Sequence, residues 1–102
     1  MQVTRDESFK ADVRAQRLWC VRHKRRDYLV GLKAGLRRVA EDLAEHPLMG
    51  QARGDGIREL LLTGRLPFVV WYSVTEDPDT ARISVRLEAL FHTSQDRPMP
   101  AE

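Results

Sequence analysis

The sequence predicts an α+β domain in which a helical hairpin packs on one face of a small antiparallel sheet. Apolar residues recur every three or four positions in the first half of the chain and every second position in the second half. Short turn sequences join the segments of the second half, which indicates an antiparallel meander. With 102 residues, of which 42% are apolar, the chain has the size of one domain with a single core.

The first half begins with a short segment, residues 2–5, which we expect to form a strand. A helix follows, with Asp6 or Ser8 as its N-cap. Its apolar stripe consists of Phe9, Val13 and Cys20, broadened by Ala11, Leu18 and Val21. The basic cluster at residues 22–26 is expected to contain the break to a second helix.

The second helix is the clearest element of the sequence. Its core-facing stripe consists of Tyr28, Leu32, Leu36, Val39 and Leu43. Arg37 and Glu41 lie four positions apart on the predicted outer side, where they would form a weak ion pair. Pro47 ends this helix, and we expect the glycine-rich residues 50–56 to form a loop.

Three strands are expected in the second half of the chain, within residues 57–62, 68–74 and 82–92. Uninterrupted alternation in the last strand places Phe91 on the apolar side and His92 on the polar side, unless a bulge shifts the register. The expected result is a two-layer sandwich, with the polar face of the sheet left free to carry function.

Composition limits the classes of protein to which the chain can belong. No apolar run approaches the roughly 18 residues that span a bilayer, and the start lacks the apolar centre of a secretory signal. We therefore expect a cytoplasmic protein with no membrane partner. Residues 1–51 carry a charge of +4 and residues 52–102 a charge of −2. The basic half favours a nucleic acid or an acidic protein as partner. In the ordinary alternative, the basic cluster at residues 22–26 is only a solvated turn between two helices and binds no partner.

No known catalytic or phosphate-binding motif occurs, and the three histidines lack metal-ligand spacing, so we expect no cofactor and no metal. The remaining candidates are polar residues of the strands and their loops: Arg53, Arg58, Glu59, Arg65, Arg86, His92, Asp96 and Arg97. Arginines bind phosphate and a histidine transfers protons, so such a set could cleave RNA. In the structural alternative, Arg58 pairs across strands with Glu59. Arg86 then pairs with Glu88 in the same way.

Four segments follow one another in a characteristic order along the chain. They are LAEHPLMG at the end of the second helix, then GIRELLL, then PFVVWYSV, and finally LFHTSQDRP. Together they resemble the RelE/ParE superfamily, and more specifically its ParE-like branch of plasmid stabilisation proteins. The resemblance extends from Val3 to Pro98 and implies a single toxin domain over residues 1–102, in which about 99–102 form a flexible tail. It also implies the β-α-α-β-β-β order that periodicity predicts.

The resemblance implies the toxin of a type II toxin–antitoxin pair, which forms a hetero-oligomer with its cognate antitoxin. An acidic, amphipathic segment of the antitoxin is expected to bind the groove between the helical hairpin and the sheet. The residues expected to contact it are Trp19, Arg22, Arg26, Leu29, Lys33 and Trp71.

The target of the toxin differs between branches of the superfamily. ParE-like members poison DNA gyrase without a catalytic site, whereas RelE-like members cut mRNA on the ribosome. All lysines lie at or before Lys33 and no tyrosine follows Tyr72, so the lysine-rich loop and terminal tyrosine of many nucleases are missing. We therefore expect gyrase inhibition. The expected target contacts are Arg53, Arg58, Arg65, His92, Asp96 and Arg97.

Two alternatives remain open for the function. One is a ribosome-dependent mRNA endonuclease that uses Arg58, Arg86 and His92, with His92 as the acid/base residue. The other is a member that is not toxic and acts only as a binding module. For His92 itself, we rank a structural role at the end of the last strand first and a catalytic role second.

Overall fold

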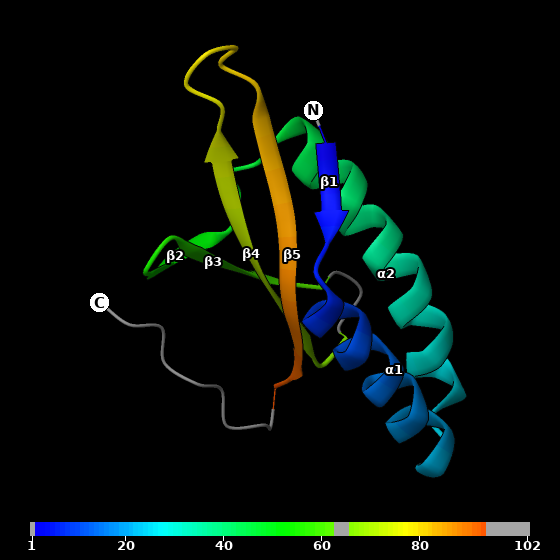
Figure 1. Ribbon diagram of the computed structural model, residues 1–102. Coiled ribbons are helices and arrows are strands. Elements are labelled where there is room, and N and C mark those ends of the chain that lie inside the picture. Colours follow the sequence, from blue (N-terminus) through cyan, green and yellow to red (C-terminus); the bar gives the residue numbers. More distant parts are fainter. Residues whose placement is uncertain (1, 63–65, 94–102) are drawn as a thin grey trace.

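A computed structural model shows a helical hairpin lying against one face of a five-stranded sheet (Figure 1). The structure describes residues 2–62 and 66–93. The elements are, in chain order, β1 (Gln2–Arg5), α1 (Glu7–Arg22), α2 (Arg26–Glu45), β2 (Gln51–Gly54), β3 (Ile57–Leu61), β4 (Phe68–Glu76) and β5 (Ile83–His92). The predicted α+β fold, with a strand, a helical hairpin and then an antiparallel meander, is therefore confirmed.

The strand order in the sheet is β1-β5-β4-β3-β2. β1 runs parallel to β5, with Gln2 opposite Ser84 and Arg5 opposite Leu87. The other neighbours are antiparallel. The first strand of the chain thus lies beside its last described strand, and the meander has four strands instead of the predicted three.

The prediction of a loop at residues 50–56 is wrong, because this segment contains β2. Asp55 and Gly56 form the two-residue turn to β3, with φ angles of 52° and 75°. Positive φ at both positions is typical of the tight turns that join antiparallel strands. β2 is exposed or half-buried along its length and carries no alternating apolar residues, so periodicity does not reveal it.

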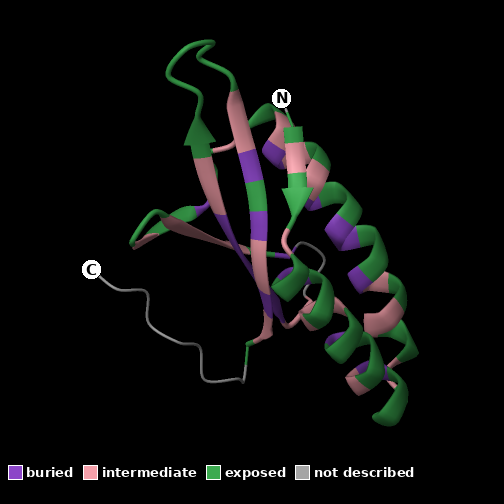
Figure 2. Cartoon of the chain, viewed as in Figure 1, coloured by how far each residue is buried: buried purple, intermediate pink, exposed green. Residues whose placement is uncertain are grey.

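The core lies between the helices and the sheet (Figure 2). The predicted stripe of α2 is confirmed, because its four aliphatic members are all buried: Leu32, Leu36, Val39 and Leu43. The stripe of α1 is narrower than predicted. Phe9 and Cys20 are buried, but Ala11 is exposed, and Leu18 and Val21 are 49% and 62% exposed. α1 packs mainly against β5, so only one narrow side of this helix is covered.

A bulge in β5 breaks the alternation that the sequence predicts. Trp71 of β4 lies opposite Ala89. Its neighbour Tyr72 lies opposite Leu87, so Glu88 is an extra residue in β5. An extra residue turns every later side chain of the strand to the other face.

Beyond the bulge, His92 lies opposite Phe68, on the side of the sheet that the helices cover. Its ring centroid is 4.9 Å from that of Trp19 in α1 and 5.7 Å from that of Phe68. Phe91 points to the helix-free face, where it contacts Trp71. The uninterrupted alternation, which places His92 on the polar face, is therefore wrong.

Neither of the two described helices is long and apolar enough to cross a membrane.

Candidate functional site

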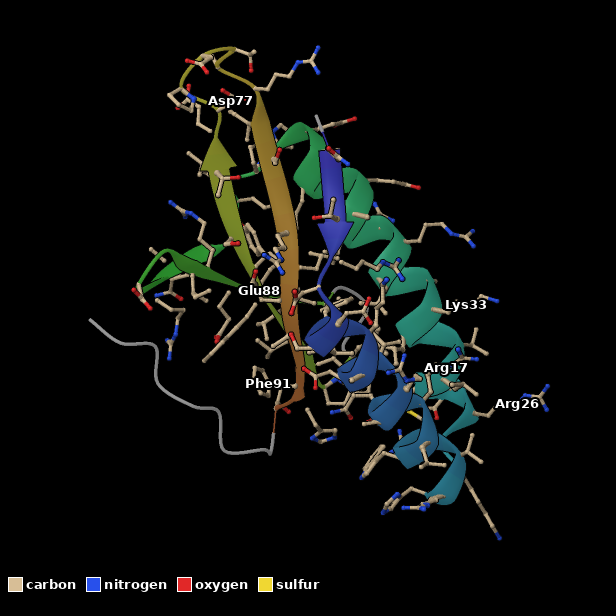
Figure 3. The ribbon with its side chains drawn as sticks, viewed as in Figure 1. Arg17, Arg26, Lys33, Asp77, Glu88 and Phe91 are labelled. Carbon is tan, nitrogen blue, oxygen red and sulfur yellow. The ribbon has the colours of Figure 1, made fainter. Side chains whose placement is uncertain are left out.

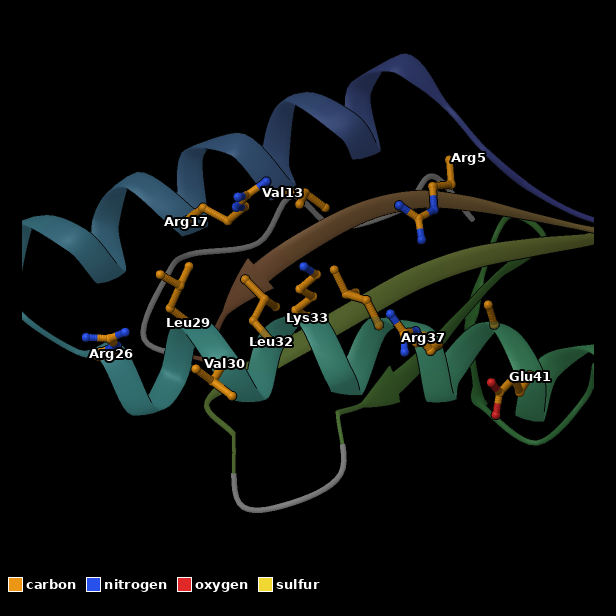
Figure 4. Close-up of a pocket in the computed structure, with 12 residues that line it drawn as sticks. Arg5, Val13, Arg17, Arg26, Leu29, Val30, Leu32, Lys33, Arg37 and Glu41 are labelled. Atoms are coloured by element: carbon orange, nitrogen blue, oxygen red, sulfur yellow. The ribbon is translucent and has the colours of Figure 1, made fainter.

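A groove of about 690 Å³ lies between α1 and α2 (Figure 4). Its apolar lining consists of Val13, Leu29, Val30, Leu32, Leu36 and Ala40. Its charged lining consists of Arg5, Arg17, Arg26, Lys33, Arg37 and Glu41. Five cations against one carboxylate, around an apolar surface, are complementary to an acidic amphipathic segment.

Helical spacing explains how one groove collects these cations. On α2, Arg26, Lys33 and Arg37 are seven and four positions apart, which places them along one side of the helix. Arg17 comes from α1 on the opposite wall (Figure 4). Arg5 comes from the end of β1. This strand pairs with β5, and the pairing holds Arg5 beside the hairpin.

The five groove cations lack ion-pair partners among the residues that the structure describes. The predicted pair of Arg37 with Glu41 is not among the ion pairs of the described residues either. Both side chains are exposed, as predicted, and both line the groove. The charge of the five groove cations therefore remains available to a partner.

Three of the six residues predicted to contact an antitoxin line the groove: Arg26, Leu29 and Lys33. Arg22 is exposed at the end of α1. Trp19 stacks on His23 with 4.4 Å between ring centroids and also contacts His92. Trp71 lies on the opposite face of the sheet, so it does not belong to the same surface.

On the helix-free face of the sheet, polar groups pair with one another. The indole Nε1 of Trp71 donates a hydrogen bond of 2.7 Å to Glu59 Oε2. Arg53 Nε lies 3.7 Å from the same oxygen, and Phe91 contacts the indole edge to face at 5.0 Å. Trp71 is only 7% exposed, although both helices lie on the other face. The charges of Arg53 and Glu59 thus serve an internal contact.

Arg58 lies on the opposite side of β3 from Glu59, so the predicted pair between them is wrong. It lies across from Tyr72, and its Nη1 donates to the carbonyl oxygens of Gly50 at 2.6 Å and Leu48 at 3.3 Å. The Gly50 N–H donates to the Tyr72 hydroxyl at 2.8 Å, and burial raises the pKa of Tyr72. Arg58 and Tyr72 together hold the loop that follows α2.

Arg86 makes ion pairs with Asp6, at the start of α1, and with Glu88 at 3.5 Å. Glu88 also accepts a hydrogen bond of 3.3 Å from the hydroxyl of Ser73. Arg86 and Glu88 do form an ion pair, but they lie two positions apart on β5, so the predicted pairing across strands is wrong.

The three residues of the nuclease alternative are not brought together. Arg58 lies against the loop after α2, Arg86 beside Asp6, and His92 beside Trp19 at the far end of β5. The remaining target contacts fall outside the described residues: Arg65, Asp96 and Arg97, with the predicted tail at 99–102. Among the described residues, no three His, Cys, Asp or Glu side chains gather as a metal site.

The sequence matches no protein-family model and no curated protein.

Proposed function

We propose that this chain is the toxin of a type II toxin–antitoxin pair of the RelE/ParE superfamily, acting in the cytoplasm. In this proposal, an acidic, amphipathic segment of the antitoxin binds the groove between α1 and α2, and the two chains form a hetero-oligomer. The resemblance implies a position for this segment between the hairpin and the sheet, but core side chains fill that space. The free toxin inhibits growth by binding DNA gyrase.

The observation that carries the proposal is the charge of the groove. Val30 is 64% exposed, and Arg5, Arg17, Lys33 and Arg37 surround the apolar lining without an ion pair to any described residue. Val13, Leu29 and Ala40 of the same lining are half-buried, so this apolar stripe stays partly in contact with water unless a partner covers it. A partner helix with apolar and acidic sides would bury this stripe and place its carboxylates beside the cations.

The antitoxin part of the proposal is tested by growth rescue. Expression of the chain alone should arrest bacterial growth, and co-expression of the protein encoded beside its gene should restore growth. The double variant Lys33→Glu/Arg37→Glu should still arrest growth but should no longer be rescued. The matched control is Arg14→Glu/Arg38→Glu, which makes the same change of charge on the helical hairpin at positions outside the groove. Rescue that survives in the groove variant would remove the groove from the proposal.

The choice of gyrase as target rests on the separation of Arg58, Arg86 and His92, since acid/base cleavage requires its groups to meet at one phosphate. Purified toxin should block supercoiling by gyrase or trap cleaved DNA. Arrest of cell-free translation with mRNA cut on the ribosome, and loss of cutting in His92→Ala, would instead support the nuclease. Normal growth during expression, with partner binding retained, would support a binding module without toxicity.

A further inference from the structure

The turn between α1 and α2 carries the densest positive charge of the chain. We call residues Arg22–Arg26, which close this turn, the hairpin tip. In Figure 1 the tip projects beyond the end of the sheet. Arg22, Lys24 and Arg26 are exposed there, and Arg26 extends outward from the start of α2 (Figure 3).

Most of this charge is not used within the described part of the molecule. Arg25 is engaged, because it pairs with Asp27 at 2.9 Å and its guanidinium lies 3.6 Å from the ring centroid of Tyr28. Arg22, Lys24 and Arg26 make no ion pair with any described residue.

The imidazole of His23 forms a fixed, exposed ring at the centre of the hairpin tip. Its Nδ1 lies 2.9 Å from the carbonyl oxygen of Trp19, within hydrogen-bonding distance. One face of the ring stacks on the indole of Trp19, at 22° between planes, and no other described ring contacts it. Trp19 is itself held by Tyr28 and His92. Because the imidazole is already held in place, a flat ring of a ligand can stack on it without the entropic cost of ordering the His23 side chain.

The backbone of the tip is strained at Lys24. Its φ of 53° is left-handed, at the position after the helix where glycine is strongly preferred. The backbone N–H groups of Lys24 and Arg25 donate to Val21 and Cys20 carbonyl oxygens, which closes the helix end around this residue. A lysine here adds a cation at the cost of strain that glycine would avoid.

We propose that the hairpin tip binds single-stranded nucleic acid. Arg22, Lys24 and Arg26 would neutralise successive phosphates, and the exposed face of His23 would stack on a base. Unneutralised cations around an aromatic ring are the combination by which proteins bind single strands with little sequence preference. This site goes beyond the proposed toxin function, and it is distinct from the groove except for Arg26, which lines both.

The first test is titration of a fluorescein-labelled 20-nucleotide single strand, as DNA and as RNA, against a duplex of the same sequence. Single strands should bind more tightly than the duplex. The double variant Arg22→Ala/Lys24→Ala should bind more weakly. The negative slope of the log of the binding constant against the log of the salt concentration should become shallower by about 1.4, since two phosphate contacts are lost. The control Arg37→Ala/Arg38→Ala removes the same charge elsewhere on the hairpin and should keep the slope of the wild type. Equal loss of slope in both variants would overturn the site and leave only a general charge effect.

The second test separates the ring and the strain from folding. His23→Ala should weaken single-strand binding by about 5-fold or more, and His23→Phe should restore most of it, because any flat ring can stack. Lys24→Gly should raise Tm by about 4–8 °C through relief of strain and yet bind the strand more weakly. Unchanged binding in His23→Ala, or binding of a polyglutamate peptide that competes fully with the strand, would overturn the proposal in favour of an acidic protein partner.

Discussion

The groove between α1 and α2 and the helix-free face of the sheet both carry arginine, but they use it differently. On the sheet, Arg53 lies beside Glu59, and Arg86 pairs with Asp6 and Glu88. In the groove, the cations have no such partners among the described residues. A polar sheet face is therefore not by itself a functional surface. Its charges can belong to the fold, whereas the cations of the groove, which we propose as the partner-binding surface, make no ion pair with a described residue.

Among the substitutions that test this difference between the sheet face and the groove, one at Trp71 should change stability most. Trp71→Ala should lower the free energy of unfolding by about 3–5 kcal/mol, because it removes a buried ring together with its hydrogen bond to Glu59. Urea denaturation measures this loss. The control Val30→Ala, at an exposed position of the groove, should change stability by no more than about 0.5 kcal/mol. Similar values for the two variants would mean that the regions do not differ in this way.

A smaller effect is expected where α1 meets β5, between the two regions. Asp12 Oδ2 accepts a hydrogen bond of 3.0 Å from the backbone N–H of Leu90, just beyond the bulge. Asp12→Ala should cost about 1–3 kcal/mol, because this part-buried N–H loses its acceptor. Hydrogen exchange of the Leu90 amide should accelerate in Asp12→Ala and much less in Asp12→Asn, which keeps an acceptor. Unaltered exchange in both variants would show that the contact does not hold the strand.

The smallest effect is a dependence on acid at Asp6. Hydrogen bonds from Ser8 and from Arg86 lower the pKa of Asp6 from 3.8 to about 2. The unfolded chain therefore binds this proton more readily, and the stabilisation, present above about pH 4, is lost as pH falls toward 2. The Tm should fall less between pH 4 and pH 2 in Asp6→Asn than in the wild type, as measured by thermal unfolding. An identical fall in both proteins would contradict a role for Asp6.

Much of the fold could be predicted because it depends on local periodicity. The stripe of α2 and the break at residues 22–26 follow directly from the spacing of apolar and basic residues. β2 escapes this reasoning because it lacks an apolar face. Its one local signal is Asp55–Gly56, a pair typical of two-residue hairpin turns.

The site was less predictable because its geometry depends on contacts distant in sequence. Half of the predicted antitoxin contacts line the groove, but Arg5 and Arg17 are missed, since their place depends on how β1 pairs and how the helices pack. His92 is misplaced for a similar reason. The extra residue at Glu88 appears only when β5 is aligned with β4.

The parallel pairing of β1 with β5 has a consequence for synthesis on the ribosome. Thr4 Oγ1 lies 3.4 Å from the carbonyl oxygen of Val85, its partner 81 positions later. At about 5–20 residues per second, roughly 4–16 seconds separate the translation of these two strands. Arg5, at the end of β1, takes its place in the groove only after β5 has been made. A nascent chain therefore presents the complete charged lining of the groove only after Leu87 has been translated, and the proposed binding of a partner would follow the synthesis of β5.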